Sequence, residues 1–152
     1  MSDYDFSTLN DKDFEILVVN LLSAEFGIKI ERFKAGKDGG VDGRFFSDGN
    51  KENIIQCKHW LKTGEAKLIK ALEDVEYEKV KKIAPKSYLV ATSVPLSRNN
   101  KTKIYEIFKD YMESSSQVLG QEDLNDLLKK HKKKKKNHYK LWFSSTHVLE
   151  KI

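Results

Sequence analysis

Three polar side chains in one short stretch have the residue types of a metal-dependent phosphodiesterase: Asp42, Gln56 and Lys58. Asp42 follows two glycines and opens a short apolar run, and Gln56 and Lys58 alternate along a second apolar run. Side chains two residues apart on a strand share a face, so the amide and the ammonium emerge side by side. Carboxylate and amide oxygens suit a hard divalent cation, and an ammonium stabilises charge that develops on a phosphate.

The length of the turn between the two runs decides whether these groups can meet. An Asp-Gly turn signal lies at residues 48 and 49. A two-residue loop would pair Asp42 with Ile55 and would put the carboxylate on the face opposite Gln56. A three-residue loop over residues 48–50 pairs Asp42 with Gln56 on one face. If these residues form a site, the hairpin must therefore have a three-residue or bulged connection.

The same stretch resembles a known family. A helical Glu15, then Gly-Gly-Val-Asp-Gly around Asp42, then Gln-Cys-Lys at residues 56–58 resembles the Mrr-like branch of the PD-(D/E)xK nuclease superfamily, the fold of many restriction endonucleases. The resemblance runs from about Phe14 to about Lys130. It implies an α/β restriction-endonuclease-like sandwich with a mixed central sheet of about five strands flanked by helices.

The resemblance also assigns roles by position. Asp42 matches the metal-binding Asp of the family, and Gln56 matches the second ligand position, where this branch commonly replaces an acid by Gln. Lys58 matches the catalytic Lys, and Glu15 the acidic residue of the first helix. The implied cofactor is Mg²⁺, for which Mn²⁺ can substitute, held by Asp42, Gln56 and the backbone carbonyl of Cys57.

Double-stranded DNA is the implied substrate. Lys34, Lys37 and Arg44 flank the glycine-rich loop and are candidates for phosphate contacts. Such contacts position DNA without reading its sequence, so a base preference is not predicted. The net charge of +5 suits a polyanionic partner.

Each residue also has a plainer interpretation. An Asp after Gly-Gly is commonly a turn residue, a strand Lys commonly serves solubility, and a Gln can bond a neighbouring strand. Glu15 can simply complement a helix dipole. The combination of Asp42, Gln56 and Lys58 around one hairpin favours a nuclease site. The rival hypothesis is a catalytically silent DNA-binding or interaction module on the nuclease fold.

The composition limits which other classes of protein and of metal site are possible. The chain has 152 residues, 39% hydrophobic and 34% charged, as expected of one polar globular domain. No stretch approaches the roughly 18 apolar residues that cross a membrane, and the acidic start lacks a secretory leader, so we expect a cytoplasmic protein. The single cysteine and the spacing of the four histidines argue against a zinc site.

Hydrophobic periodicity predicts the elements. A helix capped by Asn10 and closed by Gly27 is followed by strands at 28–33, 41–46 and 53–60. A helix over 65–82 buries its apolar stripe, which we expect to include Leu68, Ile69, Leu72 and Val75. A buried strand at 87–92, a helix from Ser97 or Asn99 through Met112, a short strand at 118–119 and a helix over 121–130 complete the order. Cys57 is expected to face the core.

We expect residues 1–131 to form the endonuclease domain, and residues 132–152 a lysine-rich segment and C-terminal helical tail leading to a further domain absent from this chain. The five lysines at 132–136 can be a solvated helix face, a linker or a phosphate-binding segment. Similar Mrr-like domains are N-terminal effectors of STAND-type NTPases in bacterial antiphage defence. The resemblance thus also implies a fused or partner NTPase and self-association in the active state.

Overall fold

The computed structural model describes residues 4–34 and 41–131. These ranges contain α-helices and β-strands, two 3₁₀ turns, η1 and η3, and one π-helical segment, η2. Their order is η1 (Phe6–Thr8), α1 (Asp11–Phe26), β1 (Glu31–Arg32), β2 (Gly43–Ser47), β3 (Lys51–Lys58), α2 (Glu65–Ala71), η2 (Leu72–Glu76), α3 (Tyr77–Ile83), β4 (Ser87–Thr92), α4 (Arg98–Phe108), η3 (Ser115–Gln117), β5 (Val118–Leu119) and α5 (Gln121–His131).

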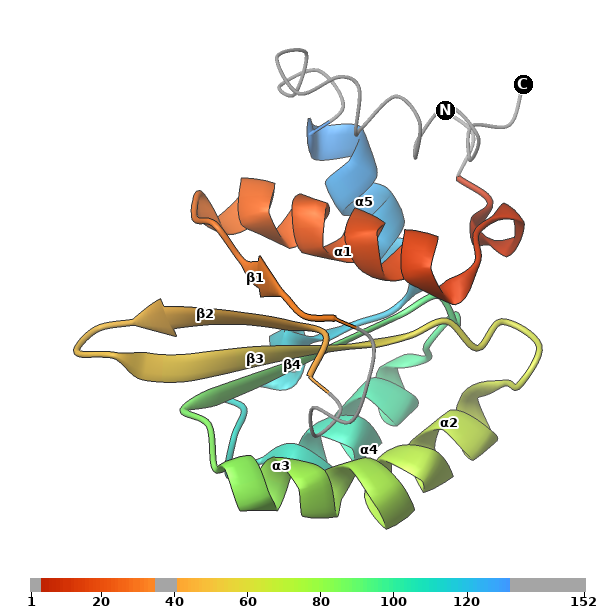
Figure 1. Ribbon diagram of the computed structural model, residues 1–152. Coiled ribbons are helices and arrows are strands. Elements are labelled where there is room, and N and C mark those ends of the chain that lie inside the picture. Colours follow the sequence, from red (N-terminus) through yellow and green to blue (C-terminus); the bar gives the residue numbers. More distant parts are fainter. Residues whose placement is uncertain (1–3, 35–40, 132–152) are drawn as a thin grey trace.

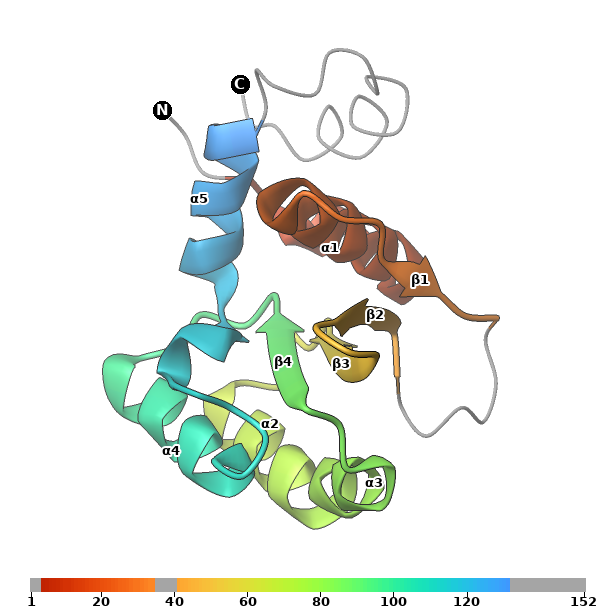
Figure 2. The same cartoon turned by 90° about the vertical axis from the view of Figure 1, so that its left-hand side faces the viewer.

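A five-stranded mixed sheet, in the order β1-β2-β3-β4-β5, divides the molecule into layers. The first three strands are antiparallel, and β3, β4 and β5 are parallel. α1 and α5 cover one face, whereas α2, α3 and α4 cover the other (Figures 1 and 2). The predicted α/β sandwich with a mixed sheet of about five strands is confirmed.

Successive side chains of β3 point alternately into the two hydrophobic cores, one on each face of the sheet. Ile55 faces the core beneath α1 and α5, and its neighbour Ile54 faces the core above α2, α3 and α4. Cys57 packs against the first of these cores, as predicted. Because side chains alternate on a strand, Gln56 then lies on the side of Ile54, toward the layer of α2 to α4.

α1 begins and ends where the sequence predicts. The Asn10 side chain accepts a hydrogen bond from the Asp13 N–H at 2.8 Å, which satisfies one of the unpaired donors of the first turn. Gly27 closes the helix with φ of +67°, in the left-handed region that glycine adopts without steric cost. Phe14, Leu17, Val18, Leu21 and Leu22 are fully buried against the sheet.

The β2–β3 hairpin has the three-residue connection that a site requires. Ser47 pairs with Lys51, so residues 48–50 form the turn. Gly49 and Asn50 have φ of +68° and +65°, which Gly and Asn tolerate better than other residues. The register pairs Gly43 with Ile55, and Asp42, which precedes the paired residues, contacts Gln56 through its side chain.

Gly43 lets the start of β2 lie close to α1. A Cβ at this position would meet Ile30 Cγ2 at 3.1 Å, Val19 Cγ2 at 3.4 Å and Ile55 Cβ at 3.5 Å. A side chain here would push β2 away from the helix. The last glycine of the Gly-Gly-Val-Asp-Gly motif is therefore explained by packing.

Several element boundaries differ from the predictions. The expected strand at 28–33 shortens to Glu31–Arg32, because the Ile28 N–H bonds the Ser23 carbonyl at the helix end and only two residues pair with β2. The expected strands at 41–46 and 53–60 are Gly43–Ser47 and Lys51–Lys58. α4 is capped by Ser97 and ends at Phe108, earlier than Met112. The strands at 118–119 and 87–92 and the last helix match closely.

The predicted helix over 65–82 contains a π-helical segment, and one buried position was wrong. Val75 is 49% exposed, whereas Glu76 is 4% exposed. The Tyr77 N–H bonds the Leu72 carbonyl five residues back, which widens that turn. A pure α-helical pattern cannot anticipate this shift of the buried stripe.

No helix within the described ranges is both long and apolar enough to span a membrane. Lys37 and residues 132–152, for which we made predictions from sequence, lie outside the described residues.

Candidate active site

A pocket of about 230 Å³ lies where β2 begins and β3 ends. In Figure 1 this is the end of the hairpin away from its turn, between α1 and the loop that leads into α2. All four predicted catalytic residues line it. The lining residues are Asp11, Phe14, Glu15, Asp42, Gln56, Cys57, Lys58, His59 and Trp60.

Asp42 is held by hydrogen bonds from the neighbouring strand. Its N–H donates at 3.0 Å to the carbonyl of Ile55, the residue that pairs with Gly43, so Asp42 lies just before the regular β2–β3 ladder. Its Oδ2 accepts the Cys57 N–H at 2.7 Å and the Gln56 Nε2 at 3.1 Å. The carboxylate and the amide are thus in direct contact, as the three-residue turn predicts. Gln56 is only 6% exposed, so few other orientations are open to it.

The Cys57 backbone faces the same space. In a strand, the N–H and C=O of one residue point toward the same neighbouring strand. Because the Cys57 N–H bonds Asp42, its carbonyl lies on the Asp42 side as well. The thiol points to the core beneath α1.

Burial and nearby negative charges make the Cys57 thiol a weaker acid than usual. Burial raises the pKa of Cys57 well above its usual value, and the charges of Asp42 and Glu15 raise it further. The group therefore stays a protonated thiol at neutral pH and does not offer a thiolate to a metal. Burial, followed by the charges of Glu76, Asp42 and Cys57, likewise raises the pKa of Tyr88.

Lys58 forms a buried ion pair that the sequence did not reveal. Its Nζ lies 2.8 Å from Glu76 Oε2, with the two side chains 14% and 6% exposed. The same Nζ lies 5.1 Å from the centroid of the Trp60 ring. Removing one partner of such a pair leaves a buried charge at a cost of about 3–5 kcal/mol. The signal that could have identified Glu76 is its spacing of four from Leu72.

Glu15 reaches the pocket from α1, on the opposite side of the sheet from Glu76. Its Oε1 lies 3.7 Å from Lys12 Nζ one turn earlier, in a pair whose Lys12 side chain is 51% exposed and whose Glu15 side chain is 17% exposed. Asp11, at the start of the same helix, also lines the pocket and was missed from sequence. The charges of Asp42 and Glu15 both raise the pKa of Cys57, so both carboxylates lie near this thiol.

His59 has a structural role. Its Nδ1 lies 2.8 Å from the Ser93 Oγ, its Nε2 donates to the Leu9 carbonyl at 2.8 Å, and its ring stacks on Phe14 at 4.7 Å. Both ring nitrogens are thus occupied. The His59 imidazole fixes the end of β3 against the start of α1.

Two of the residues predicted to contact DNA, Lys34 and Arg44, have different surroundings. Lys34 is exposed before the glycine-rich loop. Arg44 forms ion pairs with Glu31 at 3.0 Å and Glu52 at 3.4 Å, and its guanidinium lies over the Phe33 ring at 5.0 Å. A phosphate would have to compete with these two carboxylates.

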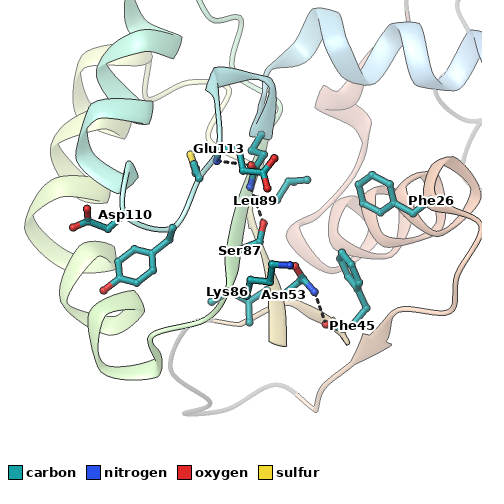
Figure 3. Close-up of a pocket in the computed structure, with 12 residues that line it drawn as sticks. Phe26, Phe45, Asn53, Lys86, Ser87, Leu89, Asp110 and Glu113 are labelled. Atoms are coloured by element: carbon teal, nitrogen blue, oxygen red, sulfur yellow. Dashed lines mark hydrogen bonds between the residues drawn. The ribbon is translucent and has the colours of Figure 1, made fainter. Parts of the chain in front are cut away.

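A larger cavity, of about 360 Å³, lies toward the other end of β3 and is drawn in Figure 3. Its polar groups bond one another: Gln117 Nε2 donates to the Ser87 Oγ at 2.8 Å, and Asn53 Nδ2 to the Phe45 carbonyl at 3.3 Å. It contains none of the predicted catalytic residues.

The donors in the site fit a hard cation. Asp42, Gln56 and the Cys57 carbonyl offer oxygen atoms, which Mg²⁺ and Mn²⁺ prefer. The occupied His59 ring and the protonated thiol remove the softer ligands that zinc prefers. Among the described residues, no group of three or more His, Cys, Asp or Glu side chains could hold a metal. The site thus resembles those in which one or two carboxylates and several waters bind Mg²⁺.

The mixed five-stranded sheet with helices on both faces is the fold of the restriction-endonuclease class of α/β proteins. Residues 6–99 match the model of the Mrr_cat family, described as restriction endonuclease. Because the match covers most of the chain, the protein belongs to this Mrr-like family. The matched segment ends at the start of α4 and includes every residue that lines the pocket.

The chain is also similar to the uncharacterized protein y4cD of Sinorhizobium fredii. The two are 40% identical over 150 residues, which is 98% of this chain. The chain spans only 23% of the length of that relative.

We predict that the pKa of Cys57 makes it a slow target for iodoacetamide. Only the thiolate reacts, so labelling of the native protein at pH 8.5 should be at least about tenfold slower than in denaturant. Asp42→Asn removes one of the charges that raise the pKa, so its labelling profile should move to lower pH. Mass spectrometry can follow this single cysteine. An unchanged profile in Asp42→Asn would show that the two groups do not interact.

Proposed function

We propose that this domain is a metal-dependent DNA endonuclease that hydrolyses phosphodiester bonds. The observation that carries the proposal is the contact of the Asp42 carboxylate with the Gln56 amide, in a pocket that Lys58 and Glu15 also line. Membership of the restriction endonuclease family supports the reaction class. The proposed metal is Mg²⁺, with Mn²⁺ as a substitute.

The proposed metal ligands are Asp42, Gln56 and the Cys57 carbonyl. A bound Mg²⁺ would supply charge neutralisation for the scissile phosphate and polarise a water molecule. The Gln56 Nε2 now donates to Asp42, but a half-turn of the amide exchanges its oxygen and nitrogen. Gln56 can therefore turn its oxygen to a cation without moving its backbone.

The remaining roles belong to charged side chains. Lys58 orients the attacking water and stabilises the negative charge that grows on the phosphate. Glu15 faces the metal or the water from the side of α1. Lys34, Lys37 and Arg44 are proposed to contact the phosphate backbone, which places the duplex without selecting a sequence.

We also propose a setting for this activity. The 23% coverage of the S. fredii relative supports a role as one part of a longer protein. The domain would then be the cleaving effector of a cytoplasmic antiphage system, with a sensor or NTPase partner and self-association as its control. Isolated protein should accordingly be assayed both as purified and as a forced dimer.

Cleavage of supercoiled plasmid tests the activity. We expect nicking that requires Mg²⁺ or Mn²⁺ and falls about 100-fold or more in Asp42→Ala and in Lys58→Ala. Asp48→Ala and Lys51→Ala, on the same hairpin but outside the pocket, are matched controls that should keep full activity.

One observation favours the rival function, a catalytically silent DNA-binding module: the Lys58 ammonium is already paired with Glu76. In that case DNA binding would persist, without metal-dependent cleavage, in wild type and in both alanine variants. This result would exclude the nuclease proposal.

A second test concerns the metal alone. Gln56 provides no charge, so we expect weak Mn²⁺ binding in the absence of DNA. Gln56→Glu adds a carboxylate beside Asp42 and should tighten Mn²⁺ binding by about tenfold or more, measured by calorimetry or water-proton relaxation. Asn50→Asp adds the same charge in the turn and should leave the affinity unchanged. Equal affinities of Gln56→Glu and wild type would place the metal elsewhere.

A further inference from the structure

We propose that Glu76 is a positioning residue for the reaction, and that its carboxylate holds the Lys58 ammonium where it acts on the phosphate. The inference rests on the proposed function, because Lys58 has a catalytic task only there. Glu76 lies outside the pocket lining and cannot itself touch DNA, since it is 4% exposed.

The contact between the two groups is short and enclosed. Glu76 Oε2 lies 2.8 Å from Lys58 Nζ, and Lys58 comes from the last position of β3. The Trp60 ring, 5.1 Å from the same Nζ, limits the ammonium on another side. A lysine has four rotatable side-chain bonds, so an anchored end greatly reduces the orientations it samples.

The second carboxylate oxygen of Glu76, Oε1, contributes little to the stability of the fold. This oxygen is buried and accepts no hydrogen bond within the described part of the chain, and it lies 3.9 Å from Lys79 Nζ. Burying a charged pair seldom stabilises a fold more than apolar side chains of similar volume would. The position of Glu76 is therefore better explained by its effect on Lys58 than by stability.

The backbone is shaped to bring this carboxylate to the sheet. Leu68, Leu72, Glu76 and Val80 are all buried and spaced by four. In an α-helix, each step of four residues turns the stripe by about 40°. The π turn that ends at Glu76 holds an extra residue and offsets part of this drift. Such single π turns occur frequently at functional sites.

Steady-state plasmid nicking with Glu76→Gln tests the proposal. The substitution keeps the shape of the side chain but removes the charge that anchors Lys58. We expect kcat to fall about 10–100-fold, the loss typical of residues that orient a group at an active site without touching the substrate. KM for DNA should be nearly unchanged. Glu73→Gln, an exposed position in the same π segment, is the matched control and should behave as wild type.

A double-variant cycle separates positioning from a general structural effect. In the Lys58→Ala background, Glu76→Gln should cause no further loss of the residual rate, because the group it positions is gone. If Glu76→Gln is unfolded by circular dichroism, Glu76→Asp is measured instead. It keeps the charge but withdraws it by one methylene, and it should fold with reduced kcat.

The outcomes separate the two proposals. Wild-type protein that binds DNA but does not cleave it with any divalent metal would remove the proposed function, and this inference with it. Wild-type cleavage with full kcat in the Glu76 variant would overturn this inference alone. An equal loss from Glu76→Gln in the wild-type and Lys58→Ala backgrounds would do the same.

Discussion

The register of the β2–β3 hairpin is the constraint on which the site depends. Residues 48–50 form the turn that pairs Gly43 with Ile55, and Asp42 then contacts Gln56; a turn shorter by one residue would shift every pair of the hairpin by one position. Gly43 lets the start of β2 lie against α1 at close range, and Glu15 of α1 lines the same pocket as Asp42 and Gln56. One local choice of turn thus brings together residues from three elements.

At the end of β3, the charged side chains of Asp42 and Lys58 are each held by specific contacts. Asp42 accepts hydrogen bonds from the next strand, and Lys58 is paired with the buried Glu76. The raised pKa of Cys57, which follows first from burial and then from the charges of Asp42 and Glu15, keeps this thiol neutral. A pocket that holds its carboxylate and its ammonium by fixed contacts is preorganised for charge that develops during a reaction.

Much of this arrangement could be predicted from sequence. Strand parity determined that Asp42, Gln56 and Lys58 share a face only with a three-residue turn, and the structure has that turn. The layer order followed from hydrophobic periodicity. Glu76 lies four residues after Leu72, which is a signal for burial, but its charge argued against a buried position, and the π turn that favours Glu76 over Val75 cannot be read from periodicity. The exposure of Val75 has the same cause. An ion pair between residues from different elements, such as Lys58 and Glu76, can be identified only from the three-dimensional structure.

The central claim is that Asp42 and Gln56 together hold a divalent cation. A crystal structure of the domain with DNA and Mn²⁺, with anomalous scattering collected at a wavelength where manganese scatters strongly, tests it most directly. The account predicts a manganese peak within coordination distance of an Asp42 carboxylate oxygen and of the Gln56 amide oxygen. A manganese peak bound elsewhere, or DNA bound with no manganese in this pocket, would contradict it.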